Sequence, residues 1–101
     1  MDVFGALADP TRRSIIELLA REGILSAGTI ADSFDSARPT ISRHLRVLRE
    51  ARLVRVTSVA QERRYALDVK ELAKAQAWIA RHRKFWGDRL AALERSLKAR
   101  P

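Results

Sequence analysis

Arginine and short hydroxyl side chains crowd one stretch of the sequence, and these residue types are suited to contacting nucleic acid. An arginine guanidinium binds a guanine edge or a phosphate through two parallel hydrogen bonds, and Ser and Thr hydroxyls bond either. The stretch covers residues 38–46, and two arginines follow it while two hydroxyl residues precede it. The candidate DNA contacts are Arg38, Thr40, Ser42, Arg43, His44, Arg46, Arg63, Arg64, Ser26 and Thr29.

The charge of the chain is segregated in the same way. The 101 residues carry a formal net charge of +8. Residues 1–35 contribute −3, residues 36–65 contribute +6, and residues 66–101 contribute +5. A merely solvated surface mixes the two signs. The segregation therefore indicates an anionic partner, which is nucleic acid, an acidic protein or an anionic membrane surface.

The composition also excludes several classes of protein. The chain has no cysteine, so disulfides, thiolate metal sites and iron–sulfur clusters are absent. The longest apolar runs are a few residues and residues 1–4 lack a signal-peptide pattern, so we expect a cytoplasmic protein that does not enter a membrane. No G-x-S-x-G, phosphate-binding glycine loop or His–nucleophile pair is present, so we expect no enzyme and no cofactor.

Helical apolar spacing and capping residues predict four helices up to the arginine-rich segment. Asp9 and Pro10 suit a helix start, Gly23 suits a helix end, and Ser26 suits the next cap. The four helices are expected over about residues 3–8, 10–22, 27–34 and 39–51. Their apolar spacing predicts a core of Ile15, Leu19, Ile30, Ile41, Leu45 and Leu48, which turns the polar side chains of the fourth helix outward.

A change of period after residue 52 predicts a hairpin. Residues 53–59 and 63–67 read as two strands, with a turn at residues 60–62 that contains no glycine. A tight turn between two helices, followed by a basic hairpin, is typical of a winged helix-turn-helix. We therefore predict a mainly α protein in the order α-α-α-α-β-β-α. Its fourth helix would read the major groove, and its hairpin would contact phosphates or the minor groove.

The remaining residues predict one long helix, about 69–99, within a single domain that spans residues 1–101. Asp68 and Glu71 have the spacing of a capping box. Such a helix is about 45 Å long, whereas a compact chain of this size is about 30 Å across. Its apolar stripe therefore needs a partner, and a second copy of the chain is the economical one. The expected dimer interface, formed by the first and last helices, contains Val3, Phe4, Leu7, Trp78, Phe85, Trp86, Leu90, Leu93 and Leu97.

Several motifs in order resemble the ArsR/SmtB family of winged-helix repressors. Residues 6–13 (ALADPTRR) resemble the opening signature of the family, residues 42–51 (SRHLRVLREA) its recognition helix, and residues 63–67 its second wing strand. Phe85 and Trp86, with the leucines after them, resemble the tail of a metal-independent branch that includes autorepressors. The resemblance covers nearly the whole chain. It implies a homodimeric, operator-binding transcriptional repressor.

The sequence departs from the family pattern at three places. Ala37 stands where the family often has a capping Ser, and Arg52 stands where it usually has Gly. If position 52 needs a positive φ, Arg is strained there by about 1 kcal/mol. The third departure is the wing tip without glycine.

The resemblance also implies that no metal is sensed. The family's thiolate sensors place a Cys pair at the start of the helix-turn-helix, where residues 25–29 hold no ligand pair. His82 stands alone among the cations Arg81, Arg83 and Lys84, which is a hostile setting for a metal ion.

Two other functions remain open from the sequence. The same basic face would serve a sequence-neutral architectural DNA-binding protein. Alternatively, Trp78 and Trp86 on the last helix would serve an adaptor that binds another protein. A small-molecule pocket or an ordinary core is a further alternative for Trp78, Phe85 and Trp86.

Overall fold

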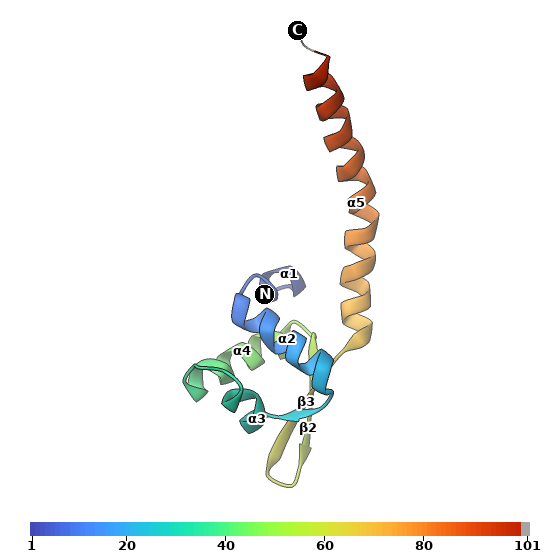
Figure 1. Cartoon of the computed structure of the whole chain (residues 1–101). Helices are drawn as coiled ribbons and strands as arrows, with labels where there is room; N and C mark the ends of the chain where they lie inside the picture. Colours follow the sequence, from blue (N-terminus) through green and yellow to red (C-terminus); the bar gives the residue numbers. More distant parts are fainter. Residues whose placement is uncertain (100–101) are drawn as a thin grey trace. The chain divides into compact units, whose positions relative to one another are not determined.

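The computed structural model describes residues 1–99, which form helices and a small sheet (Figure 1). The chain forms two compact units, one from Met1 to Glu71 and one from Leu72 onward. In chain order the elements are α1 (Val3–Ala6), α2 (Pro10–Glu22), β1 (Leu25–Ser26), α3 (Ala27–Asp32), α4 (Arg38–Glu50), β2 (Val54–Val59), β3 (Glu62–Leu67) and α5 (Val69–Lys98).

The element order confirms the predicted mainly α fold with a hairpin, and adds one strand that the prediction missed. β1 pairs antiparallel with β3, with Leu25 opposite Tyr65 and Ser26 opposite Arg64. The sheet therefore has three strands in the order β1-β3-β2. A two-residue strand shows no alternation along the sequence, so only its pairing with β3 reveals it.

Local capping chemistry sets several helix ends where the sequence predicts them, although α1 and α3 each end two residues earlier than expected. The Asp9 carboxylate accepts a hydrogen bond from the Arg12 amide at 3.0 Å and starts α2. Gly23 ends α2 with φ of 84°, a left-handed value that glycine adopts without a side-chain clash. The Ser26 hydroxyl caps α3 through the Thr29 amide. The Glu71 amide donates to Asp68 at 3.3 Å, which is one half of the predicted capping box.

The core lies where α2, α3 and α4 meet the sheet. All six residues of the predicted core are buried. The sheet adds Leu53, Val54 and Tyr65 to them, and α1 adds Ala6. Phe34, which the sequence places in the third helix, follows α3 and is only half-buried. The apolar stripe of α4 is thus packed on one side, which leaves its polar side free.

Two residues on either side of β2 have left-handed backbone. Arg52, just before β2, has φ of 63°, and Ala60, in the wing turn, has φ of 56°. Both positions lack the glycine that this conformation favours, so each is strained by about 1 kcal/mol. Position 52 therefore has the positive φ at which an arginine side chain is strained.

Helix α4 begins at Ala37 without a side-chain hydrogen bond. The neighbouring Ser36 could have supplied the cap if the helix started one residue earlier, but the structure places the N-cap at Ala37. We predict that Ala37→Ser raises the free energy of unfolding by about 1 kcal/mol, because a serine hydroxyl accepts a bond from a first-turn amide. Urea unfolding followed by circular dichroism measures it. Ser26→Ala, which removes an existing cap, is the matched control and should lower stability by a similar amount; an unchanged Ala37→Ser midpoint contradicts the prediction.

Candidate nucleic-acid interface

The polar side of α4 is exposed because its opposite side is packed into the core. Ile41, Leu45 and Leu48 are at most 2% exposed. The candidate contacts Ser42, Arg43 and Arg46 are exposed, whereas Thr40 is half-buried. Helical geometry therefore brings a hydroxyl and two guanidinium groups to the outer surface of one rigid element. This is the arrangement that reads base edges in a major groove.

Two hollows flank the exposed side of α4. One, of about 520 Å³, lies toward α2 and is lined by Arg12, Thr40, Arg43, His44, Arg46, Val47 and Glu50. The other, of about 200 Å³, lies toward β3 and is lined by Ala27, Ser42, Leu45, Arg46, Arg49, Arg63 and Tyr65. Arg46 borders both hollows. The helix is thus a basic ridge with open space on each side, as insertion into a groove requires.

The hairpin separates the two arginines of the wing. Tyr65 is buried, and Arg63 shares its side of β3 because side chains alternate along a strand. Arg63 therefore borders the same hollow as Ser42 and Arg46. Arg64 points to the other side, where its Nη2 lies 3.8 Å from Glu62 Oε2. The sequence predicts that the two arginines diverge, and the burial of Tyr65 shows which one joins the α4 surface.

Three other candidate contacts already have protein partners. Arg38 Nη2 lies 3.1 Å from Asp32 Oδ1 across the turn between α3 and α4, and both side chains are largely exposed. The Ser26 and Thr29 hydroxyls lie 2.9 Å apart at the start of α3. An exposed ion pair of this kind contributes about 0–1 kcal/mol. DNA phosphates could therefore displace it at little cost.

His44 is the candidate that the structure places differently from the others. Its side chain is only 16% exposed and lies against the start of α2 rather than on the exposed ridge. Its Nδ1 lies 3.3 Å from Arg12 Nη1 and 3.9 Å from Asp9 Oδ2. Arg12 was not among the predicted site residues. The signal that could have found it is its position three residues after the capping Asp9.

Hydrogen bonding at the start of α2 lowers the pKa of Asp9. The main cause is the bond from the Arg12 backbone amide to the carboxylate. Partial burial acts in the opposite direction, while the charge of Arg12, and that of His44 when its ring is protonated, lower the pKa further. At neutral pH, Asp9 is therefore an ionised carboxylate close to His44, in the middle of α4.

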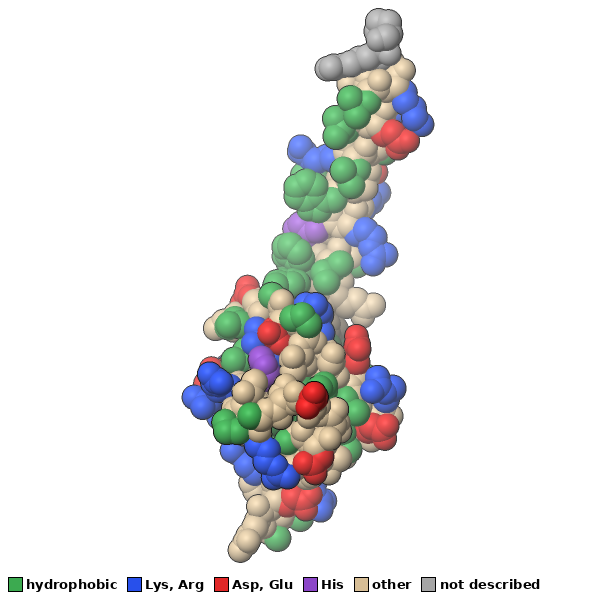
Figure 2. Space-filling model, turned by 60° about the vertical axis from the view of Figure 1, so that its left-hand side comes forward, with side chains coloured by type: hydrophobic (Ala, Val, Ile, Leu, Met, Phe, Trp, Pro, Cys, Tyr) green, Lys and Arg blue, Asp and Glu red, His purple; other side chains and the backbone are tan. Residues whose placement is uncertain are grey.

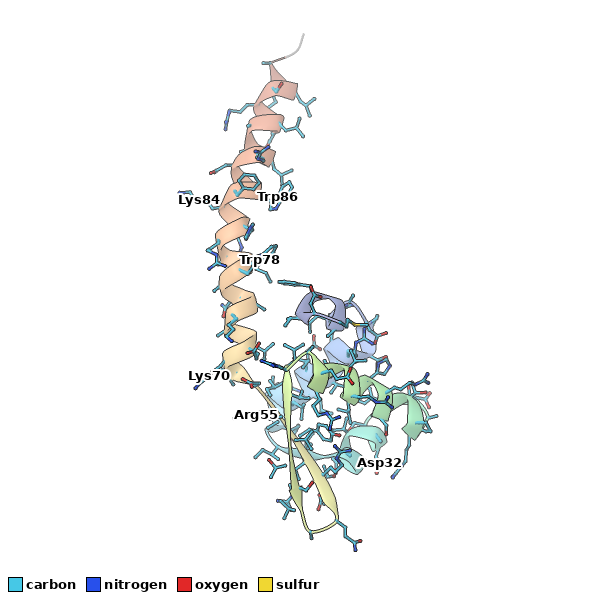
Figure 3. All side chains as sticks on the ribbon, turned by 180° about the vertical axis from the view of Figure 1, so that it is seen from behind. Asp32, Arg55, Lys70, Trp78, Lys84 and Trp86 are labelled. Atoms are coloured by element: carbon cyan, nitrogen blue, oxygen red, sulfur yellow. The ribbon has the colours of Figure 1, made fainter. Side chains whose placement is uncertain are left out.

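Helix α5 presents a second, apolar surface. Trp86, Leu90, Leu93 and Leu97 are each more than half exposed. Figure 2 shows hydrophobic side chains in a row along α5, with basic side chains along its other edge. In Figure 3, Trp78 and Trp86 project from one side of the helix and Lys84 from the opposite side. The predicted interface residues of the last helix thus form one continuous stripe.

Val3, Phe4 and Leu7, the remaining predicted interface residues, belong to the first unit. Phe4 is 41% exposed, and Val3 and Leu7 are half-buried.

Within residues 1–99, no helix is long and apolar enough to cross a membrane. The same residues contain no cluster of three His, Asp or Glu side chains that could hold a metal ion.

A helix-turn-helix whose second helix is an exposed basic ridge, followed by a basic hairpin, defines the winged helix-turn-helix class of DNA-binding proteins. Comparison with known proteins agrees with this class. A family model described as a helix-turn-helix domain matches residues 7–57. The transcriptional repressor SdpR of Bacillus subtilis is 37% identical over 78 residues, which are 77% of this chain and 86% of that protein. The HTH-type transcriptional regulator Rv2034 of Mycobacterium tuberculosis is 43% identical over 81 residues, or 80% and 72% of the two chains.

Solved structures show the same fold. An ArsR-like transcriptional regulator from Rhodococcus sp. RHA1 has 35% identity and a TM-score of 0.75, covering 92% of this chain and 87% of that one. A homodimeric winged helix-turn-helix DNA-binding domain from Mycobacterium bovis has 26% identity and a TM-score of 0.65, covering 81% and 75%. The chain belongs to the ArsR/SmtB family of winged helix-turn-helix transcriptional regulators. It is therefore a DNA-binding regulator, in a family of regulators rather than enzymes.

The lowered pKa of Asp9 gives a pH-dependent contribution to stability. A carboxyl group whose folded pKa lies below its ordinary 3.8 stabilises the fold fully above that pH, and loses this contribution as the pH falls through the folded pKa. We predict that Asp9→Asn, which keeps a capping oxygen without a titratable charge, is less stable than the native chain at neutral pH. The difference should be constant from neutral pH down to about pH 5 and should shrink below about pH 4.

Urea unfolding at a series of pH values measures this difference. Asp35→Asn is the control, because Asp35 is an exposed aspartate in the turn before α4 and is not among the groups that shift the pKa of Asp9. A gap between the native chain and Asp9→Asn that stays constant down to pH 2 contradicts the assignment.

Proposed function

We propose that the protein is a homodimeric, sequence-specific transcriptional repressor that binds double-stranded DNA in the cytoplasm without sensing a metal. The observation that carries this proposal is the exposed ridge of α4, on which Ser42, Arg43 and Arg46 stand above a fully buried apolar stripe. The name of the Bacillus subtilis relative as a repressor supports the direction of the regulation.

The exposure and position of each candidate side chain support a separate role for it in DNA binding. Ser42, Arg43 and Arg46 contact base edges in the major groove, with Thr40 at the start of the helix beside them. Arg63 lies on the same surface and contacts phosphate or the adjacent minor groove. Arg38, Ser26 and Thr29 contact phosphates near the starts of α4 and α3. Arg64 and His44 are weaker candidates, because Arg64 lies on the other side of β3 from the α4 surface and the largely covered His44 lies against the start of α2.

A second copy of the chain covers the apolar stripe of α5. Leu90 is 63% exposed, and its apolar neighbours on the stripe are also exposed. A contiguous exposed apolar surface marks an interaction site. A two-fold dimer that also uses Val3, Phe4 and Leu7 would place two α4 ridges in successive major grooves, with half-sites roughly 10–11 base pairs apart. The homodimeric Mycobacterium bovis domain supports this assembly by likeness.

The experiment that tests the function is fluorescence anisotropy of the native chain on labelled DNA. DNA from upstream of the protein's own gene is compared with scrambled DNA of the same composition across a salt series. A preference of about 10³-fold or more is the range of specific binders and is the expected result. Equal, steeply salt-dependent binding to both DNAs, and to fragments of other promoters, would instead favour the architectural alternative.

Substitutions of Arg43 and of Arg63 should weaken DNA binding in different ways. We predict that Arg43→Ala costs about 1–3 kcal/mol of binding and relaxes the preference at one or more operator positions, because a base contact carries sequence information. We predict that Arg63→Ala weakens operator and scrambled DNA alike and lowers the salt slope by about 1. Anisotropy on an operator substitution series measures both effects.

Arg64→Ala is the matched control for the wing, because Arg64 lies on the other side of the same strand and pairs with Glu62. It should change the salt slope less than Arg63→Ala. An unchanged base preference in Arg43→Ala removes Arg43 from base readout, and equal slopes in the two wing variants remove the distinction between them.

The dimer depends on the apolar stripe of α5. We predict that Leu93→Glu converts a particle of twice the 11.4 kDa chain mass into a single chain, because it buries a carboxylate in an apolar contact. Lys84→Glu, on the opposite side of the helix, is the matched control and should leave the dimer intact. Sedimentation equilibrium measures both. A native chain that sediments as a monomer with a solvent-exposed Trp emission spectrum overturns the dimer and favours the adaptor alternative.

A further inference from the structure

We propose that Arg12 is a positioning residue that ties α1 to α4 and thereby couples the dimer interface to the DNA-reading ridge. The proposal rests on the proposed function, because it assigns α1 to the interface and α4 to DNA. Arg12 borders the hollow between α2 and α4, but the role proposed for it is not a DNA contact. It acts by holding two elements in a fixed relation.

Arg12 holds the end of α1 by its backbone carbonyls. Arg12 Nε donates to the Ala6 carbonyl at 2.6 Å, and Nη2 donates to the Gly5 carbonyl at 3.2 Å. The last carbonyls of a helix have no partner within the helix and need one from elsewhere. The Gly5 carbonyl also accepts from the Ala8 amide at 3.2 Å, whereas the Ala6 carbonyl, at the very end of α1, accepts the short bond from Nε. The guanidinium therefore restrains the end of α1 mainly through Ala6.

The third nitrogen of the same guanidinium reaches α4. Arg12 Nη1 lies 3.3 Å from Nδ1 of His44. A guanidinium has only donors, so Nδ1 must accept, which assigns the proton of a neutral imidazole to Nε2. His44 follows Arg43 directly, and its ring is largely covered. A displacement of this ring therefore displaces the backbone that carries Arg43.

Asp9 holds the backbone of Arg12 in place at the start of α2. The Asp9 carboxylate accepts from the Arg12 amide at 3.0 Å, and the same oxygen lies 3.9 Å from His44 Nδ1. The end of α1, the start of α2 and the middle of α4 thus meet at one planar cation. Any repositioning of α1 at the dimer interface is transmitted through three hydrogen bonds to the ridge.

The geometry requires arginine rather than a positive charge alone. A guanidinium presents donors in a fixed planar fork, so one side chain can bond two carbonyls and a ring nitrogen at once. A lysine ammonium in its place keeps the charge but has a single centre on a flexible stem. Arg12→Lys therefore separates positioning from electrostatics. A residue that merely contacts a phosphate tolerates this exchange, because lysine also binds phosphate.

The test compares Arg12→Lys with Arg13→Lys in the full chain. Arg13 is the matched control, since its Nη1 makes a single bond, to the Leu7 carbonyl at 2.8 Å, which lysine can replace. Two measurements are made on each variant. The first is anisotropy on upstream and scrambled DNA across a salt series. The second is hydrogen exchange of the α4 amides without DNA, compared with the exchange of α2 and β3.

We expect Arg12→Lys to reduce the preference for upstream DNA about tenfold, a loss similar to that of one base contact, with an unchanged salt slope. Exchange in α4 should accelerate several-fold relative to α2 and β3. Arg13→Lys should change either quantity less than twofold. Equal behaviour of the two variants overturns the proposal, as does a uniform acceleration of exchange, which would indicate a merely structural role.

A second pair of variants covers the case in which Arg12→Lys does not fold. His44→Asn keeps an acceptor oxygen near the place of Nδ1, whereas His44→Leu has none. Faster α4 exchange in His44→Leu than in His44→Asn supports the link, and equal exchange overturns it. If the native chain prefers neither upstream DNA nor any other promoter fragment over scrambled DNA, the proposed function fails, while the exchange experiment still decides whether Arg12 links the two helices.

Discussion

The burial of Ile41, Leu45 and Leu48 is the constraint on which the DNA-binding surface depends. Burying each such side chain contributes about 1.5–3 kcal/mol, whereas an exposed ion pair such as Arg38–Asp32 contributes about 0–1 kcal/mol. Packing therefore decides how α4 is rotated about its axis, and the charged residues follow. The direction in which the arginines of α4 point is therefore set by the burial of the apolar residues between them, and not by the arginines' own interactions.

The chain accepts local costs around this packed centre. Arg52 and Ala60 hold left-handed backbone on either side of β2, and Ala37 starts α4 without a cap. Each costs about 1 kcal/mol, against a typical total stability of 5–15 kcal/mol. Strand β2, which lies between Arg52 and Ala60, pairs with β3 along its whole length, from Val54 opposite Leu67 to Val59 opposite Glu62. Pairing of β2 with β3 thus keeps the wing in place even though its two turns lack glycine.

The sequence predicts those parts of the structure that depend on local periodicity. The caps at Asp9 and Ser26 and the predicted core depend on spacings of three and four residues, and the structure confirms them. The limits of α4 are each within one residue of the prediction. The rest depends on contacts between distant residues. Strand β1 exists only through β3, and Arg12 meets His44 across 32 positions of sequence. Alternation shows that Arg63 and Arg64 diverge, but only the burial of Tyr65 decides which one faces the ridge.

Helix α5 poses the opposite problem from α4, because no residue in its described part is fully buried. Its local contacts include the Lys98–Glu94 pair, the Trp78–His82 stack and the Arg89 guanidinium over Phe85. Side-chain pairs of this kind contribute a few tenths of a kcal/mol each, and most helical stability in proteins comes from packing of an apolar face. The stripe from Trp78 to Leu97 therefore needs an apolar surface of similar length. In the proposed dimer, a second copy of the same helix would supply that surface, and the two-fold symmetry that pairs the helices would also pair the two α4 ridges.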